Sequence, residues 1–92
     1  FISLRKALPI ALSLAAPDCW LAALVKPQFE AGRENVARGG IVKDEAARQR
    51  ALGGVVDFIA AQPGWTVTGT IVSPITGQSG NVEYLLGARR AP

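Results

Sequence analysis

Histidine and methionine are absent from this 92-residue sequence, and cysteine occurs once, at Cys19. Without histidine, the chain can build neither a histidine-based catalytic triad nor a histidine metal site, and we expect no metal. A single cysteine rules out an internal disulfide framework, so Cys19 is expected to be a small, buried apolar residue. No apolar run reaches the roughly 18 to 20 residues that a membrane span needs, so no transmembrane segment is expected.

The composition is that of a folded, mildly basic domain. Hydrophobic residues make up 49% of the chain, which is too apolar for a disordered segment, and the length allows one domain at most. The net charge is +3, and seven of the ten cationic residues are arginine. Because arginine pairs bidentately with phosphate, this bias favours a nucleic-acid partner slightly.

Hydrophobic periodicity predicts an α/β fold. The expected elements are a strand end at residues 1–3, helices at 4–16 and 44–62, and strands at 19–25, 65–72 and 81–89. Ser3 is expected to cap the first helix and Asp44 the second. Close packing on the sheet is expected to compensate Gly53 and Gly54 inside the second helix. The predicted apolar stripe of that helix is Ala47, Ala51, Leu52, Val55, Phe58 and Ile59. The apolar strand at 19–25 should be covered on both faces. Helical crossovers predict parallel neighbouring strands, and the turn-rich loop before residue 81 predicts a final antiparallel hairpin strand.

Lys26 ends the apolar strand, and Pro27 forbids the strand to continue. In open α/β sheets, ligands bind outside the carboxyl ends of the parallel strands. Lys26 could therefore be an amine held on a rigid mount at the rim of a site. The alternative is a lysine that only marks the exit of the strand into solvent.

Glu83 lies within the last apolar strand, where an unpaired buried carboxylate would be costly. It should therefore either meet a cation or face water. If its strand runs close to the strand of Lys26, an ion pair between the two could orient the amine. An exposed glutamate on a half-solvated strand is the alternative.

The polar loop between residues 28 and 40 offers Arg33, Asn35 and Arg38 among glycines. Arginine beside accessible backbone N–H groups suits phosphate. The alternative is a solvated loop in which the arginines pair with Glu30 and Glu34.

Four blocks, FISL, LVKPQFEAGREN, GGIVKD and SPITGQSGNVEYLL, occur in this order and cover almost the whole chain. Together they resemble the TlyA-type hemolysins, a family built on the FtsJ-like rRNA 2′-O-methyltransferase fold. The resemblance implies methyl transfer from S-adenosylmethionine to a ribose 2′-hydroxyl of ribosomal RNA, in the cytoplasm. It also implies that residues 1–92 are the C-terminal part of a Rossmann-like methyltransferase domain, without its glycine-rich cofactor loop and its S4 domain.

The family is described as using a Lys-Asp-Lys-Glu tetrad. On the matching motifs its second lysine falls on Lys26 and its glutamate on Glu83, which makes these two the expected catalytic residues. The resemblance places the first lysine and the aspartate before Phe1. Arg33, Asn35 and Arg38 are expected to contact RNA, the basic tail at Arg89-Arg90 could do so too, and Ser3 could border the cofactor pocket.

Two other functions stay open from the sequence. The hemolysin name suggests a membrane-active cytolysin, although neither predicted helix is a long cationic amphipath with an aromatic apolar face. A catalytically silent α/β interaction module is the third possibility. Because the cofactor loop is expected to be missing, we expect this fragment alone to be inactive, and an exposed sheet edge could give a homo-oligomer.

Overall fold

The computed structural model describes residues 3–77 and 80–92, so the predicted strand end at Phe1 and Ile2 lies outside the described residues. The elements are α1 (Leu4–Ala7), α2 (Pro9–Leu14), β1 (Trp20–Val25), α3 (Pro27–Glu30), the 3-10 helix η1 (Arg33–Asn35), α4 (Glu45–Ala60), β2 (Trp65–Val72) and β3 (Tyr84–Arg90). The chain is α/β, as its sequence pattern predicts.

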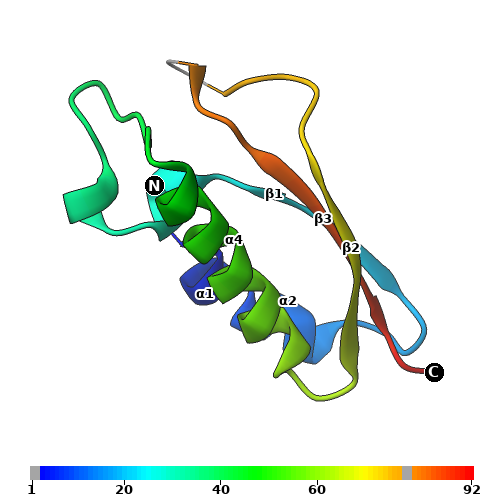
Figure 1. Ribbon diagram of the computed structural model, residues 1–92. Coiled ribbons are helices and arrows are strands. Elements are labelled where there is room, and N and C mark those ends of the chain that lie inside the picture. The colour runs from blue at the N-terminus through cyan, green and yellow to red at the C-terminus, as the bar shows by residue number, and fades with distance from the viewer. Residues whose placement is uncertain (1–2, 78–79) are drawn as a thin grey trace.

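The three strands form one sheet in the order β1-β3-β2 (Figure 1). The predicted antiparallel hairpin of β2 and β3 is present. However, β3 also pairs antiparallel with β1, so β1 and β2 run in the same direction without being neighbours. This differs from the expected parallel neighbours. The central place suits β3, because a strand paired on both sides satisfies all its backbone groups, whereas the threonine-rich β2 tolerates an exposed edge.

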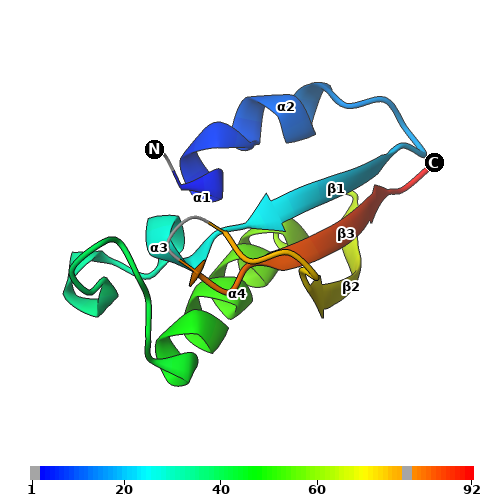
Figure 2. The same ribbon diagram turned by 90° about the horizontal axis from the view of Figure 1, so that it is seen from above.

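Helices α1, α2 and α4 lie on the same side of the sheet (Figures 1 and 2). The core forms between these helices and the sheet. Its buried residues are Leu12, Val25, Leu52, Val55, Ile59, Trp65, Tyr84, Leu86 and Ala88. The indole of Trp65 also donates a hydrogen bond of 3.2 Å to the carbonyl of Leu12, which fixes α2 against the start of β2.

The opposite face of the sheet is apolar and exposed. Trp20 is 77% exposed, and Leu24, Ile71 and Leu85 are exposed as well. Leu24 and Ile71 both pair with Leu85, so these three side chains form one row across the sheet. The expectation that the strand at residues 19–25 is covered on both faces is therefore wrong for this chain: alternate residues of β1 face the core and the exposed side.

The first predicted helix is broken in two. α1 ends at Ala7, and α2 begins at Pro9, with Leu8 between them. Proline has no N–H group to continue the helical ladder, so Pro9 interrupts the helix and occupies the first position of the next one. Ser3 caps α1 as predicted, with its hydroxyl accepting from the amide of Arg5 at 3.1 Å.

Helix α4 begins after Asp44, whose carboxylate accepts from the amide of Ala46 at 3.0 Å and so caps the helix as predicted. Its buried stripe is the predicted one, except that Phe58 is only half-buried. Apart from its chain neighbours and the backbone of its own helix, no described atom lies within 4 Å of where a Cβ on Gly53 would be, so the close packing expected to compensate this glycine is not present. Within residues 3–77 and 80–92, no helix combines the length and apolar content that crossing a membrane requires.

We predict that Gly53→Ala raises the free energy of unfolding by about 0.5–1 kcal/mol, because alanine loses less backbone entropy in a helix. The space around Gly53 accepts the added methyl group. The matched control is Gly64→Ala, at a backbone φ of 80°, which should destabilise the protein. Denaturant unfolding of both variants measures the difference, and a destabilised Gly53→Ala would contradict the prediction.

Candidate active site

The antiparallel register of β1 and β3 brings Lys26 to Glu83. The last pair of the ladder is Val25 opposite Tyr84. The residue that follows Val25 and the residue that precedes Tyr84 are therefore neighbours across the sheet. Lys26 Nζ lies 4.0 Å from Glu83 Oε2, so the ion pair predicted from the sequence is present in the structure.

Lys26 is held on a rigid mount between a strand and a helix. Its backbone is extended and forms the N-cap position of α3, where Pro27 is the first helical residue. Pro27 is fully buried, and it cannot donate to a continuing ladder. The side chain of Lys26 remains 39% exposed, and its Nζ lies 5.7 Å from the centroid of the Phe29 ring. The amine is therefore fixed at its base and accessible at its tip.

Glu83 is buried, with only 5% of its side chain exposed. Gln28 Nε2 donates a hydrogen bond of 3.0 Å to the same carboxylate oxygen, Oε2, that faces Lys26. This burial excludes the alternative of a solvent-facing glutamate. Sequence reasoning missed Gln28, because no pattern in KPQFE distinguishes a glutamine that faces a carboxylate from one in solvent.

A second buried carboxylate, Glu30, anchors the other end of α3. Glu30 accepts from the Ser3 hydroxyl at 2.6 Å and from the backbone amide of Leu4 at 2.8 Å, and Arg5 Nε lies 3.8 Å away. The side chain of Glu30 is 1% exposed. The predicted pairing of Glu30 with the loop arginines is therefore wrong, since Glu30 ties α3 to the start of α1 instead.

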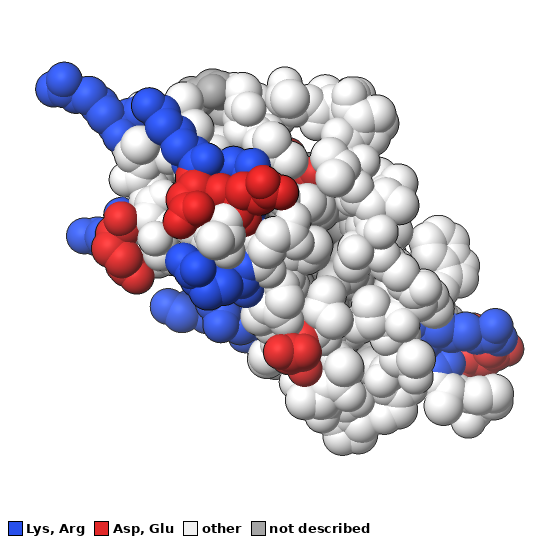
Figure 3. Space-filling view, viewed as in Figure 1, with Lys and Arg blue, Asp and Glu red and all other residues white. Residues whose placement is uncertain are grey.

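The loop after α3 presents its arginines to solvent. Arg33 and Arg38 are exposed, and among the described residues neither forms an ion pair. Asn35 lies at the end of η1 and donates to the carbonyl of Ala31 at 2.8 Å, so its amide group is partly committed to the loop itself. Figure 3 shows charged side chains gathered over this end of the molecule, beside the start of α4.

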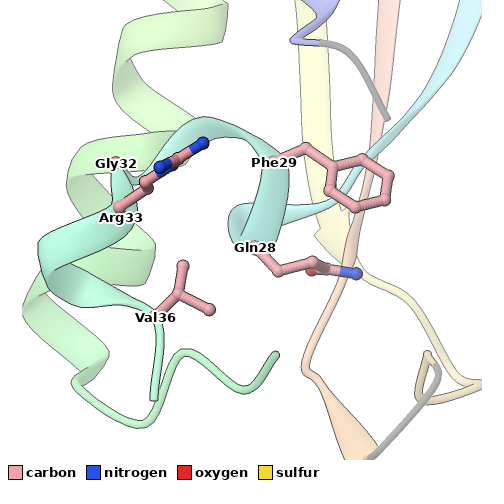
Figure 4. Close-up of a pocket in the computed structure, with 5 residues that line it drawn as sticks. All are labelled: Gln28, Phe29, Gly32, Arg33 and Val36. Atoms are coloured by element: carbon pink, nitrogen blue, oxygen red, sulfur yellow. The ribbon is translucent and has the colours of Figure 1, made fainter. Parts of the chain in front are cut away.

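A shallow pocket of about 420 Å³ adjoins the ion pair, and it is lined by Gln28, Phe29, Gly32, Arg33 and Val36. Figure 4 shows Gln28 and Phe29 on α3, with their side chains directed away from the segment that carries Gly32, Arg33 and Val36. Gln28 bonds Glu83 and the ring of Phe29 lies near the amine of Lys26, so two residues of the pocket lining contact the ion pair. The lining combines apolar surface from Phe29 and Val36 with the guanidinium of Arg33.

Asn81 joins the glycine-rich loop to the segment before β3. Its Oδ1 accepts from the amide of Val42 at 3.0 Å, and its Nδ2 donates to the carbonyl of Gly40 at 2.7 Å. Asn81 is 3% exposed. The sequence marks it only as polar among turn formers, whereas the structure shows that it fixes the approach to Glu83.

Arg89 and Arg90 lie at the opposite end of β3, about 20 Å from Glu83 at 3.3 Å per residue. Arg89 pairs with Asp18, which raises the pKa of the guanidinium through a hydrogen bond and through charge attraction. Arg90 donates to the carbonyls of Leu12 and Ala15. The tail is therefore distant from the ion pair, and both guanidinium groups bond within the chain.

Comparison with known sequences identifies the family of this chain. The sequence model of the FtsJ-like methyltransferase family matches residues 1–90. The chain belongs to the FtsJ-like methyltransferase family. The resemblance seen in the sequence motifs is thereby confirmed.

Curated relatives within the family carry methyltransferase and hemolysin names. YqxC of Bacillus subtilis, named for an inferred rRNA methyltransferase activity, is 49% identical over 86 residues, or 94% of this chain. The 16S/23S rRNA (cytidine-2′-O)-methyltransferase TlyA of Mycobacterium tuberculosis is 44% identical over 97% of the chain. Hemolysin A of Brachyspira hyodysenteriae is 40% identical over 92%. The chain spans 30%, 33% and 35% of these relatives' lengths, respectively.

Solved structures of family members share the fold. A crystal structure assigned to a hemolysin of Lactococcus lactis superimposes with a TM-score of 0.88 at 42% identity, over 96% of this chain and 41% of that one. A hemolysin-type protein of Streptococcus thermophilus gives a TM-score of 0.83 at 37% identity, over 98% of this chain and 32% of that one. The fold described above is therefore found within longer proteins that carry hemolysin names.

We predict that Asn81→Ala lowers the free energy of unfolding by about 1–3 kcal/mol, because the buried amide of Val42 loses its partner. The matched control is Asn35→Ala, which removes one partly buried bond to a loop carbonyl and should cost less. Urea unfolding of the two variants provides the comparison. Equal losses of unfolding free energy in both variants would show that Asn81 stabilises the fold no more than Asn35 does.

Proposed function

We propose that this chain carries part of the catalytic centre of an rRNA ribose 2′-O-methyltransferase, with Lys26 as its catalytic amine and Glu83 as the acid that holds it. The observation that carries the proposal is the 4.0 Å contact of Lys26 Nζ with the buried carboxylate of Glu83, the residue directly before the neighbouring strand β3. The name of the relative TlyA, which specifies 2′-O transfer to cytidine in rRNA, supports the reaction class.

The proposed chemistry needs an amine at the ribose hydroxyl. A hydroxyl group is a poor nucleophile until its proton is removed or its developing negative charge is stabilised. Lys26 would serve as the base or as the stabiliser of the alkoxide, since its tip is accessible while its backbone is fixed. Glu83 would orient the amine, because its own position is set by burial and by Gln28.

The described residues do not themselves fit a complete site for S-adenosylmethionine, which supplies the methyl group in the proposed reaction. The single hydrogen of the Ser3 hydroxyl is used in the bond to Glu30, and its oxygen also accepts from the amide of Arg5. Ser3 can therefore border a cofactor pocket but has no proton to donate to it. The proposed mechanism is restricted to the proton chemistry at Lys26.

RNA contact is proposed for Arg33, Asn35 and Arg38. The support is their position on an exposed loop beside the pocket that adjoins Lys26, with both guanidinium groups available for phosphate. Asn35 is the weakest of the three, because its amide nitrogen already bonds within the loop. Arg89 and Arg90 are left out of this surface, since they lie at the far end of β3.

Three further expectations stay predictions. The 92-residue chain alone is expected to be inactive, because the residues that the structure describes do not themselves fit a complete cofactor site. Self-association would use the open edge of β1 or β2, the outer strands of the sheet. Action in the cytoplasm is expected because ribosomal RNA is the proposed substrate.

The test of the proposed function is Lys26→Ala in the full-length protein. We predict a loss of rRNA methylation of at least about 10²-fold, the usual contribution of a positioned proton-transfer group. The measurement is incorporation of a labelled methyl group into ribosomal RNA, followed by mapping of the 2′-O position.

The matched control for this experiment is Lys6→Ala, which removes an exposed lysine of α1 and should leave the rate unchanged. Full activity of the Lys26→Ala protein, with the fold intact by circular dichroism, would refute the assigned role of Lys26.

A separate prediction concerns Arg33. Arg33→Ala should weaken RNA binding and reduce the slope of log affinity against log salt by about 0.7 to 1, the value for one lost phosphate contact. The matched control is Arg50→Ala, on the exposed surface of α4. Filter binding over a range of salt concentrations measures both, and an unchanged slope for Arg33→Ala would remove it from the interface.

A further inference from the structure

The carboxylate of Glu83 lies in a narrow slot formed by two residues that no motif assigns a role. One side is the amide of Gln28, which donates to Oε2 at 3.0 Å. The other side is the backbone of Gly77. A Cβ built on Gly77 would overlap both the carboxyl carbon and Oε2 of Glu83, and it would lie 3.1 Å from Oε1.

A glycine is needed at position 77 because it has no side chain, and not because of its backbone conformation. The positive-φ glycines of the described chain are Gly32, Gly39, Gly40, Gly64 and Gly80. Gly77 is not among them, so alanine could adopt its backbone angles without strain. Its amide donates to the carbonyl of Asn81 at 2.8 Å, which holds the loop against the carboxylate. The glycine is needed because the carboxylate occupies the space where a methyl group would be.

The orientation of the Gln28 amide is decided by the carboxylate. Only the NH2 end of the amide can donate to an ionised acid, so the oxygen must point away. That oxygen, Gln28 Oε1, is buried and has no hydrogen-bond partner among the described residues. A buried polar atom without a partner lowers the stability of the fold. The contact of Gln28 with Glu83 therefore explains a glutamine at this position better than a stabilising role does.

We propose that Gln28 and Gly77 are positioning residues that hold the Glu83 carboxylate against Lys26, Gln28 by a hydrogen bond and Gly77 by leaving space for it. The inference rests on the proposed function of Lys26. Lys26 Nζ stands 4.0 Å from Oε2, beyond an ordinary hydrogen bond, so small displacements of the carboxylate change whether the two groups interact. Neither residue needs to touch the RNA to affect the rate.

The test uses Gln28→Met, Gln28→Glu and Gly77→Ala in the full-length protein. Methionine keeps the length of the side chain and removes the donor, and glutamate adds a like charge beside Glu83. We expect kcat to fall by about 10- to 100-fold for methionine, since a displacement of about 1 Å at a reacting group has an effect of this size. Glutamate should reduce kcat further, and Gly77→Ala should match the methionine variant.

A purely structural role of Gln28 or Gly77 would change KM or the melting temperature instead of kcat alone. We expect KM for RNA to change by less than about 3-fold in all three variants, because the lost interaction acts on the reacting amine and not on substrate binding. The melting temperature of Gln28→Met should stay within a few degrees of the parent, because this change also removes the unpartnered oxygen. The matched controls are Gln62→Met, two residues after α4, and Gly53→Ala, in the middle of α4, which should keep full activity.

The outcomes separate the two proposals. Full activity of both Gln28→Met and Gly77→Ala, while Lys26→Ala is inactive, would overturn this inference and leave the proposed function in place. Losses that appear only in KM, or only together with a large fall in melting temperature, would also overturn it. An active Lys26→Ala protein would instead refute the proposed function on which the inference rests.

Discussion

The antiparallel register of β1 and β3 is the constraint on which the candidate site depends. Because Val25 pairs with Tyr84, the next residue outward on each strand is Lys26 on one side and Glu83 on the other. Side chains alternate between the two faces of a sheet, so a slip of one residue would turn the carboxylate away from the amine. The same register carries Arg89 and Arg90 to the far end of β3, where they bond to α2 and to the turn before β1. The register of β1 and β3 therefore places the Lys26 amine at one end of the sheet and the contacts of Arg89 and Arg90 at the other end.

The mount of Lys26 is stiff because both ends of the following helix are fixed. Pro27 is buried at its start, and Glu30 is bonded to Ser3 and Leu4 at its end. By contrast, the loop that follows keeps Arg33 and Arg38 exposed. A rigid base with an accessible tip suits an amine that must meet a hydroxyl group in one geometry, while an exposed, charged loop suits the irregular surface of a folded RNA. This division supports the roles proposed for Lys26 in proton chemistry and for the loop in phosphate contact.

Local chemistry in the sequence predicted the three strands, helix α4 and the two residues of the ion pair, but neither the break in the first helix nor α3. Caps at Ser3 and Asp44, the stripe of α4 and the stop at Pro27 are short-range signals, and the structure contains all of them. The order of strands could not be read in this way, because nothing local to Tyr84 states which strand it will pair with. Gln28 and Glu30 were missed for the same reason: their partners lie 55 and 27 residues away along the chain. The exposed face of β1 was also misread, because an apolar run has the same composition whether one side or both are covered.

Nuclear Overhauser effects across β1 and β3 of the full-length protein, in solution, test the central claim most directly. In an antiparallel ladder, the opposing residues that do not exchange backbone hydrogen bonds bring their Hα protons close enough for strong cross-peaks. We expect such Hα–Hα peaks between Leu24 and Leu85 and between Ala22 and Gly87, together with side-chain contacts between Lys26 and Glu83. Hα–Hα peaks that pair Leu24 with Tyr84 or Leu86, or with a residue of β2, would contradict the register, and the proposed catalytic pair would then have no structural basis.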